Sequence, residues 1–324
     1  MENFYFMKKL STIAVLIWTA FSVNTYAATI TLGTAPNLQT LPIVVAQKEG
    51  FFAEEGLELE TVKFTSGRRA LEALIGGQLD VAFMAEYPVS IASLREQPFG
   101  TFTTLSRYTA NRLISKNSIG FEDISSLEGK KIGTTKGSNT EFFTEALLES
   151  ASVTAEVINV SPPDIVPALA RGDIDAGVMF PDFYPSAEKA LGDDYAEFRS
   201  DAYVAWFVLS ATPTMFEDRP DDLVAFVRAL VKAEEFIKSS PEQAQIALAE
   251  ATEGLLSLEL IKEKFPEAEY EIGLSNGLLD LLETQAEWVV SKGMVEAKPS
   301  RELIKQYLKT APLAAVDASR ITLE

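Results

Sequence analysis

One local pattern occurs twice in this chain, and the repeat constrains the fold more than any other feature of the sequence. Residues 76–88 read GGQLDVAFMAEYP, and residues 172–185 read GDIDAGVMFPDFYP. When Ala73 is aligned with Ala168, the offset is 168 − 73 = 95 residues. The identities at this offset are Gly77 with Gly172, Asp80 with Asp175 and Met84 with Met179. Each copy combines a turn, an apolar run typical of a strand buried in a parallel sheet and a polar loop, which predicts two similar α/β units.

Apolar periodicity around the first copy alternates between strand and helix. Strands are expected over 28–35, 57–64 and 80–85, and helices over 40–48 and 68–76. This β-α-β-α-β order is typical of a doubly wound α/β lobe.

The second copy lies in a segment with the same order. Strands are expected over 131–135, 155–160 and 174–180, and helices over 141–148 and 164–169. Asp164 is expected to cap the second of these helices. The two copies are therefore interpreted as the third strand of each lobe.

Two further segments, 102–115 and 202–211, are expected to be strands that cross between the lobes, followed by a helical tail that packs on the first lobe. A chain of 324 residues is also longer than one hydrophobic core usually supports. We predict two doubly wound α/β lobes joined by two crossing strands. Lobe 1 is expected over 28–108 and 207–324, and lobe 2 over 109–206.

The first residues have the features of an export signal. Two lysines precede the apolar run LSTIAVLIWTAF and the small-residue cleavage site TYA. We expect 1–27 to be a signal peptide cleaved near Ala27, whether the start is Met1 or Met7. The chain has no cysteine, so it has neither disulfides nor a cysteine lipid anchor, and its net charge of −19 disfavours nucleic acid and anionic membranes. A free, monomeric periplasmic protein with no nucleic-acid partner is expected.

The predicted topology also places a binding site. Ligands of open parallel sheets bind beyond the carboxyl ends of the strands, and two hinged lobes can close on a ligand and exclude water. The loops expected to line a shared cleft are Pro36–Gln39, Ser66–Arg68, Glu86–Pro88, Lys136–Thr140 and Phe180–Phe183.

The loop after the first strand of lobe 2 contains a helix-start signal. Ser138 and Glu141 have the spacing of a capping box. Free N–H groups at such a helix start also bind anionic oxygens. Ser138, Asn139 and Thr140 are therefore candidates for an anion site, with simple capping by Ser138 as the alternative.

Other candidate ligand groups are acids, aromatic rings and arginines. Glu86 and Asp182 follow the two matching strands and together suit an amine or an exocyclic NH₂ group, with two solvated loop acids as the alternative. Arg68 and Arg112 suit an acidic group, with surface exposure as the default. The rings that suit a planar or apolar ligand, with core packing as the alternative, are Tyr87, Tyr108, Phe180, Phe183 and Trp206.

The absence of histidine and cysteine excludes several kinds of site. Neither a Ser-His-Asp triad, nor a cysteine nucleophile, nor a histidine or thiolate zinc site can form. The acidic pairs 193–194 and 221–222 lack the spacing of a calcium loop. Two-carboxylate glycosidase chemistry through Glu86 and Asp182 is the enzymatic alternative, and no other residue favours it. We expect no enzyme, no metal and no cofactor.

Four motifs carry a resemblance to a known family. They are AQKEGFFAEEGLELE (46–60), ALIGGQLDVAFMAEYP (73–88), LEGKKIGTTKGSNTEFF (127–143) and ALARGDIDAGVMFPDFYP (168–185). In this order they resemble the periplasmic solute-binding proteins of nitrate, sulfonate and taurine uptake systems, a family that also includes thiamine-pyrimidine binding proteins. The resemblance covers essentially the whole chain after the signal peptide.

The resemblance implies a type II periplasmic binding fold that delivers ligand to an ABC transporter permease. It places the family's ligand loops on Asn37–Leu38, Glu86–Tyr87, Ser138–Thr140 and Phe180–Asp182. Many relatives carry a Glu-Pro pair where this chain has Phe180-Pro181-Asp182, which shifts the expected contact to Asp182 or Phe183. An enzyme-like branch of the family makes the thiamine pyrimidine with its own histidine, and this chain has none.

The sequence therefore predicts a receptor for a small polar organic ligand, with a taurine-like or other sulfonate favoured. An aminopyrimidine thiamine precursor is the alternative ligand. A subunit that reports ligand to a membrane signalling partner is the alternative role.

Overall fold

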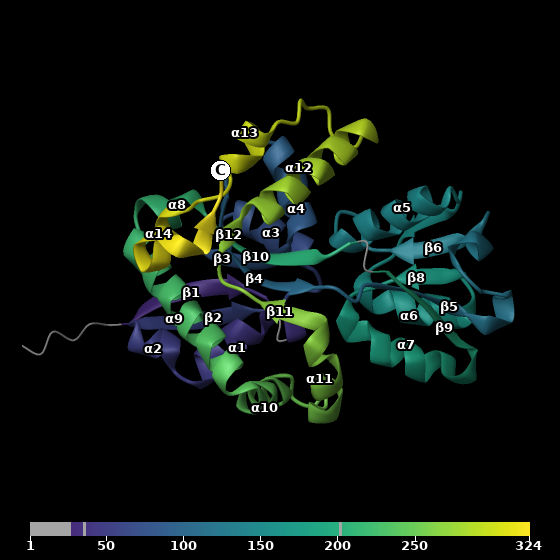
Figure 1. Ribbon diagram of the computed structural model, residues 1–324, viewed down its shortest axis with the longest axis horizontal. Coiled ribbons are helices and arrows are strands. Elements are labelled where there is room, and N and C mark those ends of the chain that lie inside the picture. The colour runs from purple at the N-terminus through teal and green to yellow at the C-terminus, as the bar shows by residue number, and fades with distance from the viewer. Residues whose placement is uncertain (1–26, 35–36, 201–202) are drawn as a thin grey trace, which may run out of the picture.

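The computed structural model describes residues 27–34, 37–200 and 203–324, and it shows two α/β lobes side by side (Figure 1). Lobe 1 is built on a six-stranded sheet and lobe 2 on a five-stranded sheet. The predicted signal peptide lies outside the described residues except for Ala27. In the part of the chain that is described, no helix combines the length and apolar character needed to cross a membrane.

The lobe 1 sheet has the strand order β11-β4-β10-β3-β1-β2. Strands β1, β2 and β3 run parallel, and β10 lies antiparallel between β3 and β4. The strands are β1 (Ala28–Gly33), β2 (Leu57–Val62), β3 (Val81–Ala85), β4 (Gly100–Tyr108), β10 (Ala205–Ala211) and β11 (Ala268–Tyr270), with the short pair β12 (Leu274–Ser275) and β13 (Ile321–Thr322) beside them.

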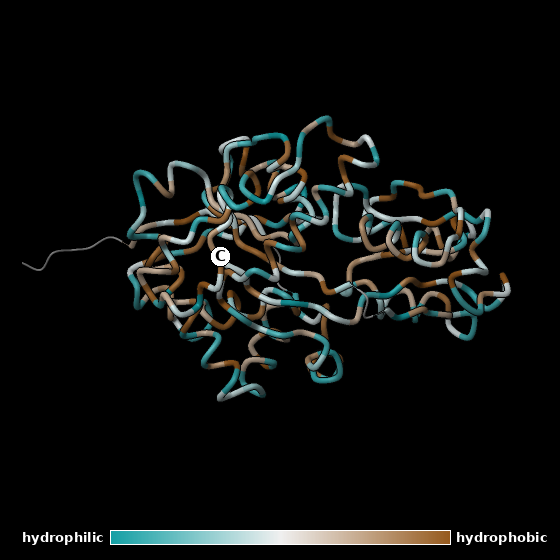
Figure 2. Tube along the Cα trace, turned by 45° about the horizontal axis from the view of Figure 1, so that its top comes forward, coloured by the Kyte–Doolittle hydropathy of each residue, from teal (hydrophilic) through white to brown (hydrophobic). Residues whose placement is uncertain are grey.

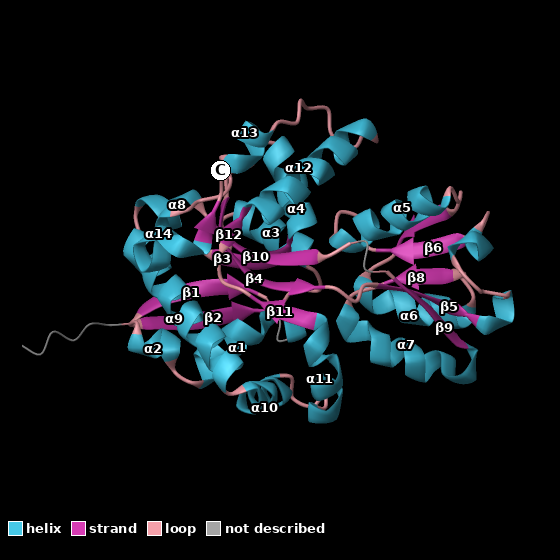
Figure 3. Ribbon diagram, in the orientation of Figure 1, coloured by secondary structure: helices cyan, strands magenta, loops and turns pink. Residues whose placement is uncertain are grey.

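Helices cover both faces of this sheet, and the long helices of the tail belong to this lobe, as predicted (Figure 3). Helix α9 packs on α1, and α12 packs on α4. The helices are α1 (Leu41–Lys48), α2 (Phe51–Glu54), α3 (Gly67–Ile75), α4 (Glu86–Leu94), α8 (Pro213–Glu217), α9 (Pro220–Ser239), α10 (Pro241–Ala251), α11 (Leu258–Lys264), α12 (Asn276–Ser291), α13 (Arg301–Lys305) and α14 (Ala311–Asp317).

The lobe 2 sheet has the order β7-β6-β8-β5-β9, with β6, β7 and β8 parallel and β5 antiparallel to both of its neighbours. Strand β9 was not predicted. The elements are β5 (Arg112–Lys116), β6 (Lys131–Thr134), β7 (Glu156–Asn159), β8 (Ala176–Val178), β9 (Tyr195–Arg199), α5 (Asn139–Ala151), α6 (Pro162–Arg171) and α7 (Tyr184–Leu191).

Three local predictions are wrong. The predicted crossing strand 102–115 is two strands, β4 and β5, which belong to different sheets. Helix α6 begins at Pro162, so Asp164 lies in its first turn and does not cap it. The predicted loop 86–88 is the first turn of α4, because this helix starts directly after β3.

The repeated pattern occupies equivalent places in the two sheets. Strand β3 lies next to β1 in the order β2-β1-β3, and β8 lies next to β6 in the order β7-β6-β8. On its other side each strand pairs with an antiparallel strand, β10 for β3 and β5 for β8, and each of these strands adjoins a connection between the lobes. The repeat therefore encodes the strand where each lobe joins the crossing segments.

The two aspartates of the repeat, Asp80 and Asp175, make the same kind of hydrogen bond in each lobe. An Asp80 carboxylate oxygen accepts the Thr31 backbone N–H at 2.9 Å, and an Asp175 oxygen accepts the Lys131 N–H at 2.9 Å. In each lobe the aspartate thereby adds a hydrogen bond just beyond the backbone pairing of β1 with β3, or of β6 with β8. Apolar residues lie along the inner elements of both lobes, and polar residues dominate the outer loops (Figure 2).

Candidate ligand-binding site

A cavity of about 380 Å³ lies between the lobes. Lobe 1 contributes the segments that follow β1, β2 and β3, and lobe 2 contributes the start of α5, the start of α6 and the turn after β8. These are the strand-end positions at which open parallel sheets bind ligands. The cavity has the size of a small-molecule site.

The structure brings half of the predicted ligand residues to this cavity. Lobe 1 contributes Asn37 and Ser66, and lobe 2 contributes Ser138, Asn139, Phe180, Asp182 and Phe183. The other predicted residues do not line it, and these are Leu38, Glu86, Tyr87, Tyr108, Arg112, Thr140 and Trp206.

The start of α5 differs from the predicted capping box. Ser138 occupies the N-cap position, but its hydroxyl donates to the Thr135 carbonyl at 2.7 Å and shares a 2.8 Å hydrogen bond with the Thr140 hydroxyl. The Glu141 carboxylate accepts the Gly137 N–H at 2.7 Å instead of the Ser138 N–H. No side chain caps α5, a 13-residue helix, and Ser138 and Asn139 at its start line the cavity. The start of a helix without a side-chain cap has free N–H groups that suit an anionic oxygen.

Asp182 is the acid that reaches the cavity. It lies in the turn after β8, and its carboxylate hydrogen-bonds the Asn37 side chain of lobe 1 across the cleft. Burial between the lobes raises the pKa of Asp182 to about 7, and the Asn37 hydrogen bond opposes this rise. The carboxyl group is therefore poised between its neutral and charged forms near neutral pH.

Glu86 has a different environment from the one predicted. It is fully buried in the first turn of α4, where its carboxylate accepts hydrogen bonds from the Tyr203 hydroxyl, the Gln285 amide at 2.7 Å and the Trp206 backbone N–H at 3.0 Å. Desolvation raises the pKa of Glu86 to about 7 against the effect of these donors. Its acceptor groups are used within the protein, so it does not pair with Asp182 around a ligand.

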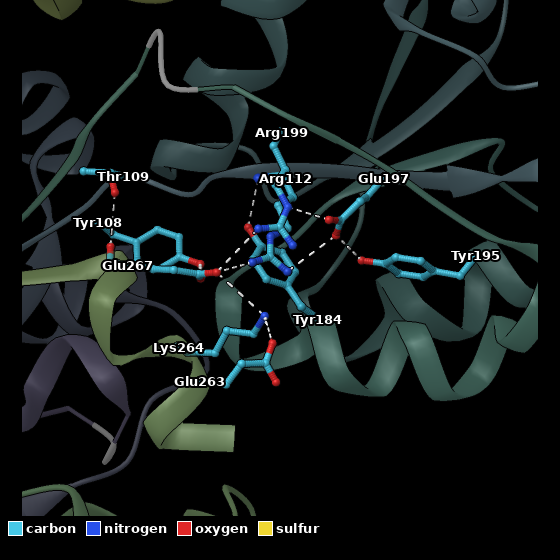
Figure 4. A network of polar contacts seen from close by, with 10 residues as sticks. All are labelled: Tyr108, Thr109, Arg112, Tyr184, Tyr195, Glu197, Arg199, Glu263, Lys264 and Glu267. Atoms are coloured by element: carbon cyan, nitrogen blue, oxygen red, sulfur yellow. Dashed lines mark hydrogen bonds and ion pairs between the residues drawn. The ribbon is translucent and has the colours of Figure 1, made fainter. Parts of the chain in front are cut away.

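Arg112 and Tyr108 belong to an ion-pair network at the connection between the lobes (Figure 4). The Arg112 side chain is 3% exposed, and its guanidinium contacts Glu267 at 2.5 Å and Glu197 at 3.5 Å. The Tyr108 hydroxyl donates to Glu267 at 2.6 Å. Because Arg112 and Glu197 lie in lobe 2 while Tyr108 and Glu267 lie in lobe 1, this network fastens the lobes together and leaves Arg112 buried away from the cavity.

Two of the predicted aromatic residues, Tyr87 and Trp206, contact other side chains of the protein instead of the cavity. The Tyr87 ring is buried 5.7 Å from Phe142 and 6.2 Å from Trp288, so it joins α4 and α12 of lobe 1 to α5 of lobe 2. Trp206 lies under the Arg107 guanidinium, 4.9 Å from it. Both rings pack within the protein, as the core-packing alternative predicts.

Sequence reasoning missed two aromatic residues of the cavity wall. Phe83 of β3 and Phe207 of β10 stack with their centroids 5.5 Å apart and their planes 9° apart, and both line the cavity. Gln39, whose loop was expected to line the cleft, also lines the cavity, is 2% exposed, and has no hydrogen-bond partner for its Nε2 atom. The only sequence signal for Phe83 was its place near the end of a predicted strand, which we interpreted as core.

Cation-coordinating chemistry has no visible basis in the described residues. They contain no group of three or more acidic, histidine or cysteine side chains close enough to hold a metal ion. Arg68 and Asp182 are the charged members of the cavity wall among these residues.

The family model described as NMT1/THI5 like matches residues 37–244, a range that includes every cavity-lining residue named above. The chain belongs to the NMT1/THI5-like family. This NMT1/THI5-like chain is 24% identical over 240 residues to the taurine-binding periplasmic protein of Escherichia coli (strain K12). The match covers 71% of the chain and 72% of the E. coli protein.

Two further matches are a solved structure and an enzyme. The alkanesulfonate-binding protein SsuA from Xanthomonas axonopodis pv. citri, solved bound to MOPS, superposes with a TM-score of 0.74 at 16% identity, covering 87% of this chain and 98% of that one. This likeness shows the periplasmic binding fold. The 4-amino-5-hydroxymethyl-2-methylpyrimidine phosphate synthase of Aspergillus parasiticus is 25% identical over 230 residues, 63% of this NMT1/THI5-like chain and 64% of that enzyme.

Proposed function

We propose that the protein is the periplasmic solute-binding component of an ABC import system and captures a small organic ligand in the cavity between its lobes. The observation that carries this proposal is the cavity itself, which both lobes line at the ends of their parallel strands. The binding proteins among its relatives support the same role. The protein is monomeric, is exported by the signal peptide at 1–27, and hands its ligand to a membrane permease.

The favoured ligand is a sulfonate, including taurine-like aminosulfonates. The uncapped start of α5 and the Arg68 side chain offer donors and positive charge to an anionic oxygen. Asp182 offers an acceptor to an amine elsewhere in the same cavity. Closure of the lobes then removes both groups from water and strengthens their contacts with the ligand.

Calorimetry with taurine, ethanesulfonate and nitrate tests this proposal. Ser186→Trp places a large side chain at the cavity from α7, where the serine is exposed, and is expected to abolish binding. Ser150→Trp, at an exposed position of α5 outside the cavity, is the matched control and is expected to bind like the parent protein. Binding that survives Ser186→Trp, or the absence of binding across ligand classes, contradicts the proposed site.

Asp182 favours a second candidate ligand, an aminopyrimidine. A carboxyl group aimed into an aromatic cavity suits the N–H groups of such a base. Asp182→Asn is expected to weaken an amine-bearing ligand by roughly 1.5–3 kcal/mol, typical of a charged hydrogen bond, and to leave a simple sulfonate no weaker.

The pH dependence separates amine-bearing ligands from simple anions. Because the pKa of Asp182 is raised to about 7, its carboxylate form grows as the pH rises through 7. Affinity for an amine-bearing ligand, whether an aminosulfonate or an aminopyrimidine, is expected to rise over this interval, and affinity for an anion without an amine is expected to fall. The sign of the change, measured by calorimetry at pH 6 and pH 8, shows whether the ligand carries an amine.

A further inference from the structure

Aromatic rings form both walls of the interlobe cavity. In lobe 1, Phe83 and Phe207 come from the neighbouring antiparallel strands β3 and β10 and stack almost in parallel. They are only 7% and 9% exposed, yet both line the cavity. In lobe 2, Phe180 and Phe183 flank the turn after β8 and line it as well. A ligand bound between the lobes is therefore bordered by aromatic side chains from both of them.

The charges of the cavity do not suit a bare inorganic anion. Of the described residues in its wall, Arg68 is the cation, and its guanidinium already lies 2.6 Å from Glu72. Asp182 adds an acid to the same wall. A volume of about 380 Å³ is also many times the roughly 30 Å³ that a water molecule occupies in the liquid, so a triatomic or tetra-atomic ion leaves most of the apolar wall without contacts.

We propose that the cavity selects ligands with a planar, aromatic body, which lies between the Phe83–Phe207 pair and the Phe180–Phe183 turn when the lobes close. This inference rests on the proposed function of ligand capture in the cleft, but it does not depend on the head group. Aromatic rings in stacked or edge-on contact gain more than their buried area alone provides. Rings on both walls offer such contacts to the ligand from each lobe.

Two pairs of ligands with matched head groups test the proposal by calorimetry. Benzenesulfonate is compared with ethanesulfonate, and 4-aminopyrimidine with acetamide, which is also neutral and also carries an NH₂ group beside an acceptor atom. In the pair whose head group the protein accepts, the aromatic member is expected to bind at least about tenfold more tightly, the scale of one to two aromatic contacts.

Variants then assign that preference to the walls. Phe207→Leu keeps an apolar side chain but removes a ring, and is expected to reduce the aromatic preference, the ratio of the two affinities, to less than about threefold. Phe180→Leu makes the same test in lobe 2, at a turn outside the buried core. Phe216→Leu is the matched control, because Phe216 is a partly buried ring on α8 that does not line the cavity.

The outcomes separate the two proposals. If the aliphatic member binds as tightly as its aromatic partner, the aromatic inference is overturned and the receptor function stands. If a tenfold aromatic preference persists in both phenylalanine variants, the assigned walls are wrong. If none of the four ligands binds to folded protein, both the receptor proposal and this inference fail together.

Discussion

Glu86 provides a direct test of how burial competes with hydrogen bonding in this protein. Its carboxyl group has no solvent exposure, and three donors surround it, from Tyr203, Gln285 and the Trp206 backbone. The donors favour the charged form, and loss of hydration favours the neutral form. Loss of hydration is the larger effect, so the pKa of Glu86 rises to about 7.

The sign and size of the effect on stability follow from the two states of the chain. Glu86 has an ordinary pKa of 4.5 when unfolded and about 7 when folded. Between these values the folded protein keeps a proton that the unfolded chain has lost. The stabilising contribution is therefore fully present below pH 4.5 and is lost as the pH rises through 7. At about 1.4 kcal/mol for each pKa unit, the loss is roughly 3 kcal/mol of the free energy of unfolding.

Urea unfolding of Glu86→Gln and the parent protein at pH 4.5 and pH 8 measures this loss. The altered hydrogen bonds of Gln add an offset that does not depend on pH, and Asp182 titrates in both proteins, so both effects cancel in the comparison. The stability difference is expected to move by about 3 kcal/mol in favour of the variant as the pH rises. Glu269→Gln, at a side chain that is 55% exposed, is the control and is expected to show no such movement. A difference that is equal at both pH values refutes the reasoning, and a movement in favour of the parent means that the three donors outweigh desolvation.

Three further predictions concern the cleft and the connection between the lobes. Gly137→Ala adds a Cβ atom at a residue with φ +76°, 2.4 Å from the Arg68 side chain across the cleft. It is expected to weaken ligand binding about tenfold in calorimetry, whereas Gly129→Ala, at φ +70° with open space around it, should keep the parent affinity. Glu267→Gln is expected to cost about 3 kcal/mol in urea unfolding, because it leaves a buried guanidinium short of its partner, whereas Glu269→Gln should cost less than about 1 kcal/mol. Gln39→Met removes a buried donor that has no partner and is expected to stabilise the unliganded protein by about 1 kcal/mol; a lower melting temperature contradicts this.

The local pattern was sufficient to predict the inner parallel strands of both sheets, because these strands are largely buried, but it did not predict the edge strands β9 and β11. The continuous apolar runs at 80–85 and 174–180 correspond to β3 and β8, and the offset between them correctly indicated two lobes of one kind. The crossing segments were harder to predict. Only the three residues 109–111 separate β4 from β5, and none of them is glycine or proline, so no turn signal within 102–115 marks the point where the chain leaves one sheet for the other.

The site was harder to predict than the fold, because its polar residues are assigned by partners far away in the chain. Arg112 is buried by Glu267, which lies 155 residues later. Glu86 is covered by Gln285, which lies 199 residues later. No local pattern contains that information. The aromatic wall of lobe 1 was missed for a related reason, since Phe83 continues the apolar run of its strand and differs from a core residue only in lying at the cleft.

The two acids that follow the repeated strands diverge because of a difference of two residues in length. The strands align at an offset of 95, but the Tyr-Pro pairs that follow align at 184 − 87 = 97. In lobe 1, α4 begins directly at Glu86, and the helix carries this acid into the interior. In lobe 2, the two additional residues are accommodated in a three-residue 3-10 turn, Pro181–Phe183, before α7, and this turn holds Asp182 at the cavity. The tyrosine that follows is buried in both lobes, Tyr87 fully and Tyr184 with 3% exposure, and it anchors the start of each helix. The number of residues between the strand and this tyrosine therefore decides which acid lies at the cavity.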